Sequence, residues 1–130
     1  MSQHLDFPAR LRIKSKKEIE FLVETRNSLF QHPFLLKYHF ERLDEGHLTS
    51  PQFAVTVPKK HFRKAHVRNL IKRRIREAYR LNWRNYFPES SHYKVSFLFI
   101  LVGKKIPDYS ELESGIKEIF IKLAKMDVSI

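Results

Sequence analysis

The sequence contains no cysteine, and this absence excludes disulfide bonds, thiolate zinc sites and cysteine nucleophiles together. A chain without cysteine suits a reducing compartment. The longest apolar run, residues 95–102, has only the length of a strand and falls far short of the roughly 20 residues that span a bilayer. The N-terminus also lacks the charged and then apolar pattern of a signal peptide. We therefore expect a cytoplasmic protein with no membrane among its partners.

Glycine and proline are also scarce, with three and six residues among 130, which argues against a low-complexity or disordered chain. The chain is long enough to bury a core, and 42% of its residues are hydrophobic. We expect one domain over residues 10–130, preceded by a polar arm over residues 1–9 that shows no periodicity.

The residue patterns of a protein active site are missing too. The chain shows no Ser/His/Asp order, no glycine-rich phosphate loop and no paired carboxylates. Seven histidines are present, including His61 and His66, but none has a metal-ligand spacing together with a carboxylate partner. The sequence therefore predicts no catalytic residue, no metal site and no small-molecule substrate on the protein itself.

Acidic residues are rare where basic residues are most frequent, in residues 59–84. This segment holds eleven Lys and Arg and one acid, Glu77, so it carries a formal +10 of the chain's +11. At about 100° per residue, polar and cationic residues fall on one helix face, namely Asn69, Lys72, Arg73, Arg76, Arg80 and Arg84. The opposite face is apolar and comprises Val67, Leu70, Ile71, Ile75, Ala78 and Leu81. The pattern predicts a helix that buries one face and presents the other to a polyanion.

A solvated helix surface is the ordinary explanation of such a charged face. Here like charges follow one another at four-residue steps from Arg68 to Arg80, and each such pair destabilises a helix by roughly 0.2–0.5 kcal/mol. A functional face accounts for this cost better than a merely structural one. The alternatives are a DNA-binding or ribosomal RNA-binding protein without a processing role, and a helix resting on anionic lipid. Lipid binding is disfavoured because the apolar face suits a protein core.

Local patterns predict three helices and at least three strands. Ser15 and Glu18 have the spacing of a capping box, and a polar segment with Gly46 separates the first two predicted strands. We expect the second strand to lie antiparallel to the first. The expected elements are a helix over 16–28, a strand from 34, a loop over 44–50, a strand over 52–57, the basic helix over 67–82, a strand over 93–102 and a helix over 109–125.

The segment VPKKHFRKAHVRNLIKRRIREAYR, residues 57–80, resembles the signature of the protein subunit of bacterial ribonuclease P. The matching elements, in order, are Lys59-Lys60, Arg68-Asn69, Lys72-Arg73 and Arg76-Glu77. The resemblance implies an α+β fold, a two-layer sandwich with element order αβββαβα. Its sheet would be mixed, mostly antiparallel and of about four strands, which requires a further short strand near the lysine pair.

The resemblance also implies that the catalyst is an RNA. In this family the RNA subunit binds Mg²⁺ and cleaves precursor tRNA at its 5′ end, while the protein carries no cofactor, binds the RNA subunit and holds the 5′ leader. The partners would be the ribonuclease P RNA and precursor tRNA. The residues implied to contact the RNA subunit are Lys59, Lys60, Arg68, Asn69, Lys72, Arg73, Arg76 and Arg80.

A leader groove is implied between the first helix and the sheet. The helix positions that correspond to it are Ile19 and Val23, where many relatives have phenylalanine, and the strand offers Phe34 and Tyr38 for base stacking. Core packing is the alternative for both strand residues. The chain also departs from the family in having Pro58 before the lysine pair and no glycine between Lys59 and Asn69, so we expect an altered path for residues 58–66.

Overall fold

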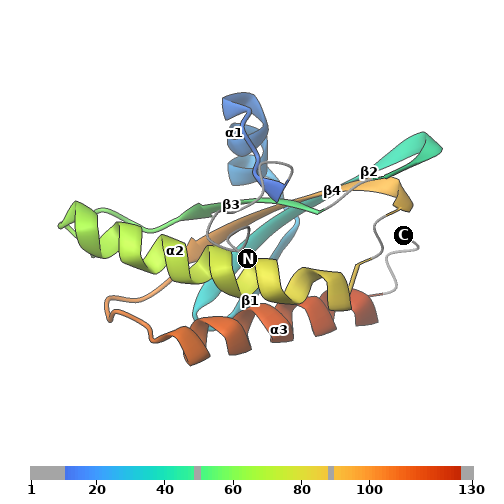
Figure 1. Ribbon diagram of the computed structural model, residues 1–130. Helices are drawn as coiled ribbons and strands as arrows, with labels where there is room; N and C mark the ends of the chain where they lie inside the picture. The colour runs from blue at the N-terminus through green and yellow to red at the C-terminus, as the bar shows by residue number, and fades with distance from the viewer. Residues whose placement is uncertain (1–10, 49–50, 88–89, 127–130) are drawn as a thin grey trace, which may run out of the picture.

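Four strands form one mixed sheet in the spatial order β1-β2-β4-β3, with helices on both faces (Figure 1). The structure is a computed structural model that describes residues 11–48, 51–87 and 90–126, so the predicted arm over residues 1–9 lies outside it. The elements are α1 (Lys16–Glu24), β1 (Ser28–Gln31), β2 (Phe34–Leu48), β3 (Gln52–Thr56), α2 (Ala65–Asn82), the 3-10 turn η3 (Trp83–Asn85), β4 (Ser90–Leu101) and α3 (Tyr109–Lys125). The predicted α+β class, four-stranded mixed sheet and element order are confirmed.

The predicted pairing of β3 is wrong. β3 does not lie antiparallel to β2 but pairs in parallel with β4, while β2 pairs antiparallel with β1 and with β4. β2 extends to Leu48, through most of the predicted loop, with a register shift between Arg42 and His47. β4 has a run of buried residues from Val95 to Phe99, as expected of a strand covered on both faces. β4 is therefore an inner strand of the sheet. β2 pairs with one of its edges, and β3 pairs with the other.

Two further predictions about the elements are corrected. α1 ends at Glu24 rather than at residue 28, because Thr25 is extended and its hydroxyl accepts a hydrogen bond from the Asn27 N–H at 3.4 Å. The short additional strand is β1, which precedes β2. No strand forms at the lysine pair, where Lys59 and Lys60 lie in a turn. α2 begins two residues earlier than predicted, whereas α3 has the predicted bounds.

The main core lies between the sheet and the layer formed by α2 and α3 (Figure 1). At its centre, the ring of Tyr79 is fully buried and stacks on Phe53, with centroids 4.1 Å apart and planes 4° from parallel. The Tyr79 hydroxyl donates a hydrogen bond of 2.5 Å to the Pro51 carbonyl. α2 is therefore fixed against β3 by both a ring contact and a polar contact.

Burial raises the pKa of Tyr79 well above its ordinary value of 10.0. Its neutral form is therefore favoured in the folded state. The stability that this provides is complete below pH 10 and is lost as the pH rises toward the folded-state pKa. We expect Tyr79→Phe to cost about 1 kcal/mol near neutral pH, through the lost hydrogen bond, and to make stability fall less steeply in alkali. Urea unfolding at a series of pH values checks this, and an unchanged alkaline slope would contradict it.

A smaller core lies on the opposite face of the sheet, beneath α1. Leu22 packs there with Ile13 and Leu98. Ser15 caps α1 by accepting a hydrogen bond from the Glu18 N–H at 3.2 Å, as predicted. The Glu18 carboxylate accepts a hydrogen bond from Ser96 Oγ at 2.7 Å. This bond fastens the first turn of α1 to the central strand.

Candidate nucleic-acid interface

α2 carries the predicted division into a buried and a polar face. Its buried residues are Ile71, Ile75, Ala78, Tyr79 and Asn82. On the polar side, Asn69 and Arg73 are exposed, while Lys72, Arg76 and Arg80 are half-buried. The placement of Leu81 in the core is wrong, because this side chain is 52% exposed. Asn82 lies inside instead, and its amide donates hydrogen bonds to the Ala78 carbonyl and to Glu113 at 2.7 and 3.1 Å.

Like Arg74, which donates a hydrogen bond of 3.2 Å to the Pro107 carbonyl, Arg68 is bound to the chain's own backbone. Its Nη1 donates hydrogen bonds to the carbonyls of Phe62 and Arg63 at 2.7 and 2.9 Å. Phe62 is buried and its N–H donates to the Pro58 carbonyl, so the segment that precedes α2 is fixed at several points. Lys59 and Lys60 are exposed in the turn of this segment. Arg68 therefore positions the lysine pair beside the start of α2, a role that the sequence does not reveal.

Arg80 is held by the only acid of the basic segment. Its guanidinium donates two hydrogen bonds to the Glu77 carboxylate, from Nε at 3.0 Å and from Nη2 at 2.8 Å. The hydrogen bond to Glu77 is also the main cause of a raised pKa for Arg80. Part of its charge is thus neutralised within the protein. Arg73, with its larger exposure, presents a less compensated charge to a partner.

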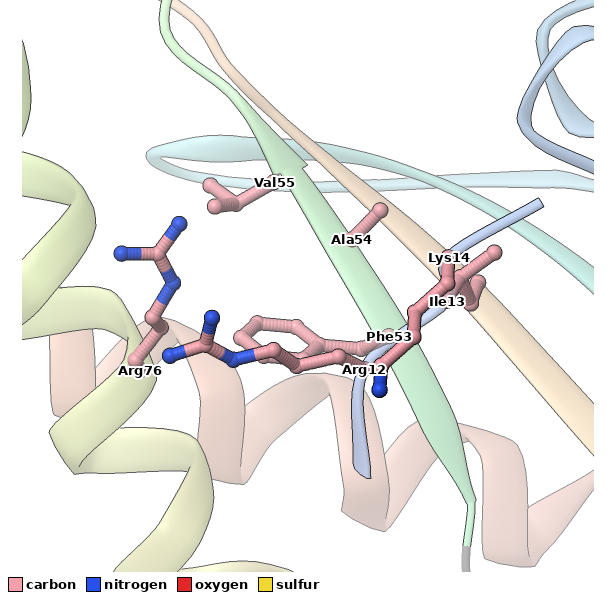
Figure 2. Close-up of a pocket in the computed structure, with 7 residues that line it drawn as sticks. All are labelled: Arg12, Ile13, Lys14, Phe53, Ala54, Val55 and Arg76. Atoms are coloured by element: carbon pink, nitrogen blue, oxygen red, sulfur yellow. The ribbon is translucent and has the colours of Figure 1, made fainter. Parts of the chain in front are cut away.

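Arg76 faces a second arginine, Arg12, which no pattern in the sequence singles out. The two guanidinium groups, of Arg12 and Arg76, turn toward the same cavity beside β3 (Figure 2). Burial lowers the pKa of Arg76, and the charge of Arg12 lowers it further. No sequence signal connects the two, because the pairing of Arg12 with β3 is a tertiary contact.

The predicted groove residues lie on two different faces of the sheet. Ile19 and Val23 belong to α1, with Ile19 half-buried and Val23 exposed. Phe34 and Tyr38 lie on the other face, in the main core, with only 0% and 8% of their surfaces exposed. Their predicted position beside the first helix is therefore wrong. Successive residues of a strand point to opposite faces, so an error of one position moves a side chain to the wrong side.

The side chains of the face that carries α1 are the alternate residues of the same strands. Phe30 is paired with Leu35, and Leu35 with Ile100, while Thr56 follows on β3. Leu35 and Ile100 are half-buried, and Phe30 is 57% exposed. This row of four residues, which we call the open row, leaves apolar surface uncovered beside a short helix. The face that carries α1 thus has an aromatic side chain, but it is Phe30 of β1 and not the predicted Phe34 or Tyr38 of β2.

Other kinds of site find little support in the part of the chain that the structure describes. Within residues 11–48, 51–87 and 90–126, no group of three or more His, Cys, Asp or Glu side chains is arranged to hold a metal ion. Among the same residues, no helix combines the length and apolar character of a membrane span.

Comparison with known proteins gives concordant results. The family model of Ribonuclease P matches residues 7–124. The chain is 31% identical over 120 residues to a ribonuclease P protein component of Porphyromonas gingivalis, and the match covers 85% of each protein. Its fold is similar to the RNase P protein of Thermotoga maritima, with a TM-score of 0.65, 18% identity and coverage of 85% of this chain and 96% of that one. The RNase P protein of Staphylococcus aureus gives a TM-score of 0.64 at 18% identity, with 88% and 95% covered.

Proposed function

The chain belongs to the ribonuclease P protein family, and from this premise we propose that it binds the catalytic RNA subunit of ribonuclease P and the 5′ leader of precursor tRNA. In this role it promotes endonucleolytic maturation of the tRNA 5′ end in the cytoplasm. Mg²⁺, held by the RNA subunit, supplies the chemistry of cleavage. The protein residues bind and orient RNA.

The observation that carries this proposal is the polar face of α2. The helix is fixed to the core by Ile71, Ile75 and Tyr79, so its outward cations keep a constant spacing. Arginine can bind a phosphate through two parallel hydrogen bonds, and an amide such as Asn69 can contact a base edge or a 2′-hydroxyl. α2 also begins without a side-chain cap and without an acid in its first turn, so its N-terminal end stays positive. Each of these features favours a folded polyanion as the partner.

The residues proposed for the RNA subunit fall into three groups. Arg73, Lys72 and Asn69 contact it from the outward face of α2. Lys59 and Lys60 contact it from the turn that Arg68 supports. Arg80 contributes with a charge that Glu77 partly neutralises, and Arg76 contributes from a half-buried position beside Arg12.

For the 5′ leader we propose a path along the open row, next to Ile19 and Val23. A single strand offers its bases there to the exposed ring of Phe30 and to the apolar surface of Leu35 and Ile100. β3 and β4 are parallel, so the segments that follow them leave the sheet at the same end, and these segments contain Lys59-Lys60 and Lys104-Lys105. An apolar row with two lysine pairs near it suits a single-stranded RNA, whose bases can contact the apolar side chains and whose phosphates can contact the lysines.

Phe30→Ala tests this path. We expect the reconstituted enzyme to lose about tenfold of its preference for leader-bearing over mature tRNA, because stacking on an aromatic ring contributes roughly 1–3 kcal/mol per base. Binding affinities for the two substrates measure the preference. Met126→Ala, which truncates another exposed apolar side chain at the end of α3, is the matched control. An equal loss of affinity for both substrates would show that Phe30 does not contact the leader.

Reconstitution tests the function itself. The purified chain is added to ribonuclease P RNA at low Mg²⁺ concentration, and 5′ processing of precursor tRNA is followed. We expect the protein to restore processing that the RNA alone performs poorly. If the chain binds RNA but does not stimulate cleavage, it is a basic RNA-binding protein without a processing role.

A further inference from the structure

A cavity of about 390 Å³ lies between β3 and α2. Figure 2 shows the guanidinium groups of Arg12 and Arg76 reaching into it from different parts of the chain. Three of the seven described lining residues are cationic, and these seven residues are Arg12, Ile13, Lys14, Phe53, Ala54, Val55 and Arg76. A cavity with this composition suits a small region of negative charge.

The backbone holds Arg12 in place although its side chain is exposed. Arg12 forms a parallel bridge with Phe53, and the Ile13 N–H donates a hydrogen bond of 3.1 Å to the Phe53 carbonyl. The residues on either side, Leu11 and Ile13, are buried in the two different cores. The buried neighbours therefore anchor the backbone of Arg12 from both sides, so its side chain starts from a fixed position beside the sheet.

Arg76 is held with similar rigidity on the other side of the cavity. It follows Ile75, which is fully buried, on a helix that packs against the sheet. Burial and the charge of Arg12 both disfavour its charged form, which is seen in the lowered pKa of Arg76. An oxyanion placed between the two groups would reverse this repulsion and accept hydrogen bonds from both forks.

We propose that Arg12 and Arg76 together bind one phosphate group of the RNA backbone, with Lys14 at the edge of the site. The inference rests on the proposed function and extends it, because it brings the segment before α1 into the RNA interface. Arg76 lines the cavity and also belongs to the row of cations at four-residue steps from Lys72 to Arg80, so an RNA backbone lying along this row would reach the cavity at Arg76. One phosphate would then link residues 11–14, β3 and α2.

The test compares Arg12→Gln, Arg76→Gln and the double variant in binding to ribonuclease P RNA at several salt concentrations. We expect each single variant to bind roughly fivefold more weakly near physiological salt and to lower the salt slope by roughly 0.7–0.9, the effect of one phosphate contact. Because both arginines share one phosphate, the double variant should lose little more than either single one. Lys122→Gln, which removes an exposed cation from α3, should change binding less.

Four results would overturn the proposal. If the wild-type chain does not bind the RNA, both this inference and the proposed function fail. If the wild type binds and Arg12→Gln binds with the same affinity and salt slope, only the phosphate site fails. Losses that add fully in the double variant would mean two separate contacts. A calorimetric titration with inorganic phosphate tests whether the site binds a free ion instead of RNA. If phosphate binding is lost in Arg12→Gln while the affinity of this variant for RNA is unchanged, the ligand of the site is a free phosphate ion.

Discussion

Replacing Lys72 and Arg73 together by glutamine is expected to weaken binding of ribonuclease P RNA about tenfold to thirtyfold near physiological salt. The two side chains project from the polar side of α2, and Arg73 is exposed. Each phosphate contact that is lost should lower the slope of log affinity against log salt by roughly 0.7–0.9, so the double variant should show about twice that change. Filter binding or fluorescence anisotropy at several salt concentrations measures both quantities.

Lys122→Gln with Lys125→Gln is the matched control, because it removes two exposed cations from the last turn of α3. If this pair reduced affinity and slope as much as the α2 pair, net charge alone would drive binding and the assigned face would be wrong. Replacing Arg68 would test this face less clearly than replacing Lys72 or Arg73. Its alanine variant would also release the Phe62 and Arg63 carbonyls, so loop position and charge would change together.

Gly115→Ala is expected to lower the free energy of unfolding by about 1–3 kcal/mol, the usual cost of overpacking a core. A Cβ atom at this position would lie 2.8 Å from the His32 carbonyl oxygen and 2.8 Å from Pro33 Cδ, with the Phe34 ring at 3.3 Å. The carbonyl oxygen belongs to the backbone and cannot rotate away. This steric cost opposes the helix-propensity gain of about 1 kcal/mol that alanine brings over glycine.

Ser114→Ala provides the control for the same helix. Ser114 is exposed, so the alanine changes propensity without touching the β1–β2 turn. Urea unfolding should show this variant to be as stable as the wild type or slightly more stable. If Gly115→Ala were equally stable, the turn would have room to move away from α3.

The helices of this chain could be predicted well because their patterns are local. α3 has the predicted bounds, and the polar and apolar faces of α2 follow from a period of 3.6 residues apart from Leu81 near its end. The predicted burial of Leu81 was wrong because the position of α3 decides which side of α2 is covered. The partner strand of β3 could not be derived either, since strand order depends on contacts between distant segments.

The site was predicted in part, for the same physical reasons. The cations of α2 and the exposed lysine pair were identified, and their contacts with RNA stay predictions. The groove aromatics were assigned to Phe34 and Tyr38, whereas the strand alternation places Leu35 and Phe30 on the relevant face. Arg12 and the supporting role of Arg68 were missed, because neither residue type nor spacing indicates a hydrogen bond to a particular carbonyl or a neighbour across the sheet.

The position of β3 at the edge of the sheet has a consequence for the protein in the absence of RNA. An edge strand has unpaired N–H and C=O groups to which a strand of another chain can bind, and such pairing commonly leads to aggregation. Here the segment Arg12–Ile13 pairs with Phe53 along that edge, and the guanidinium groups of Arg12 and Arg76, which turn toward the same cavity beside β3, would repel an incoming copy with the same charges. The cations proposed to bind a polyanion would therefore also keep newly made chains apart from one another.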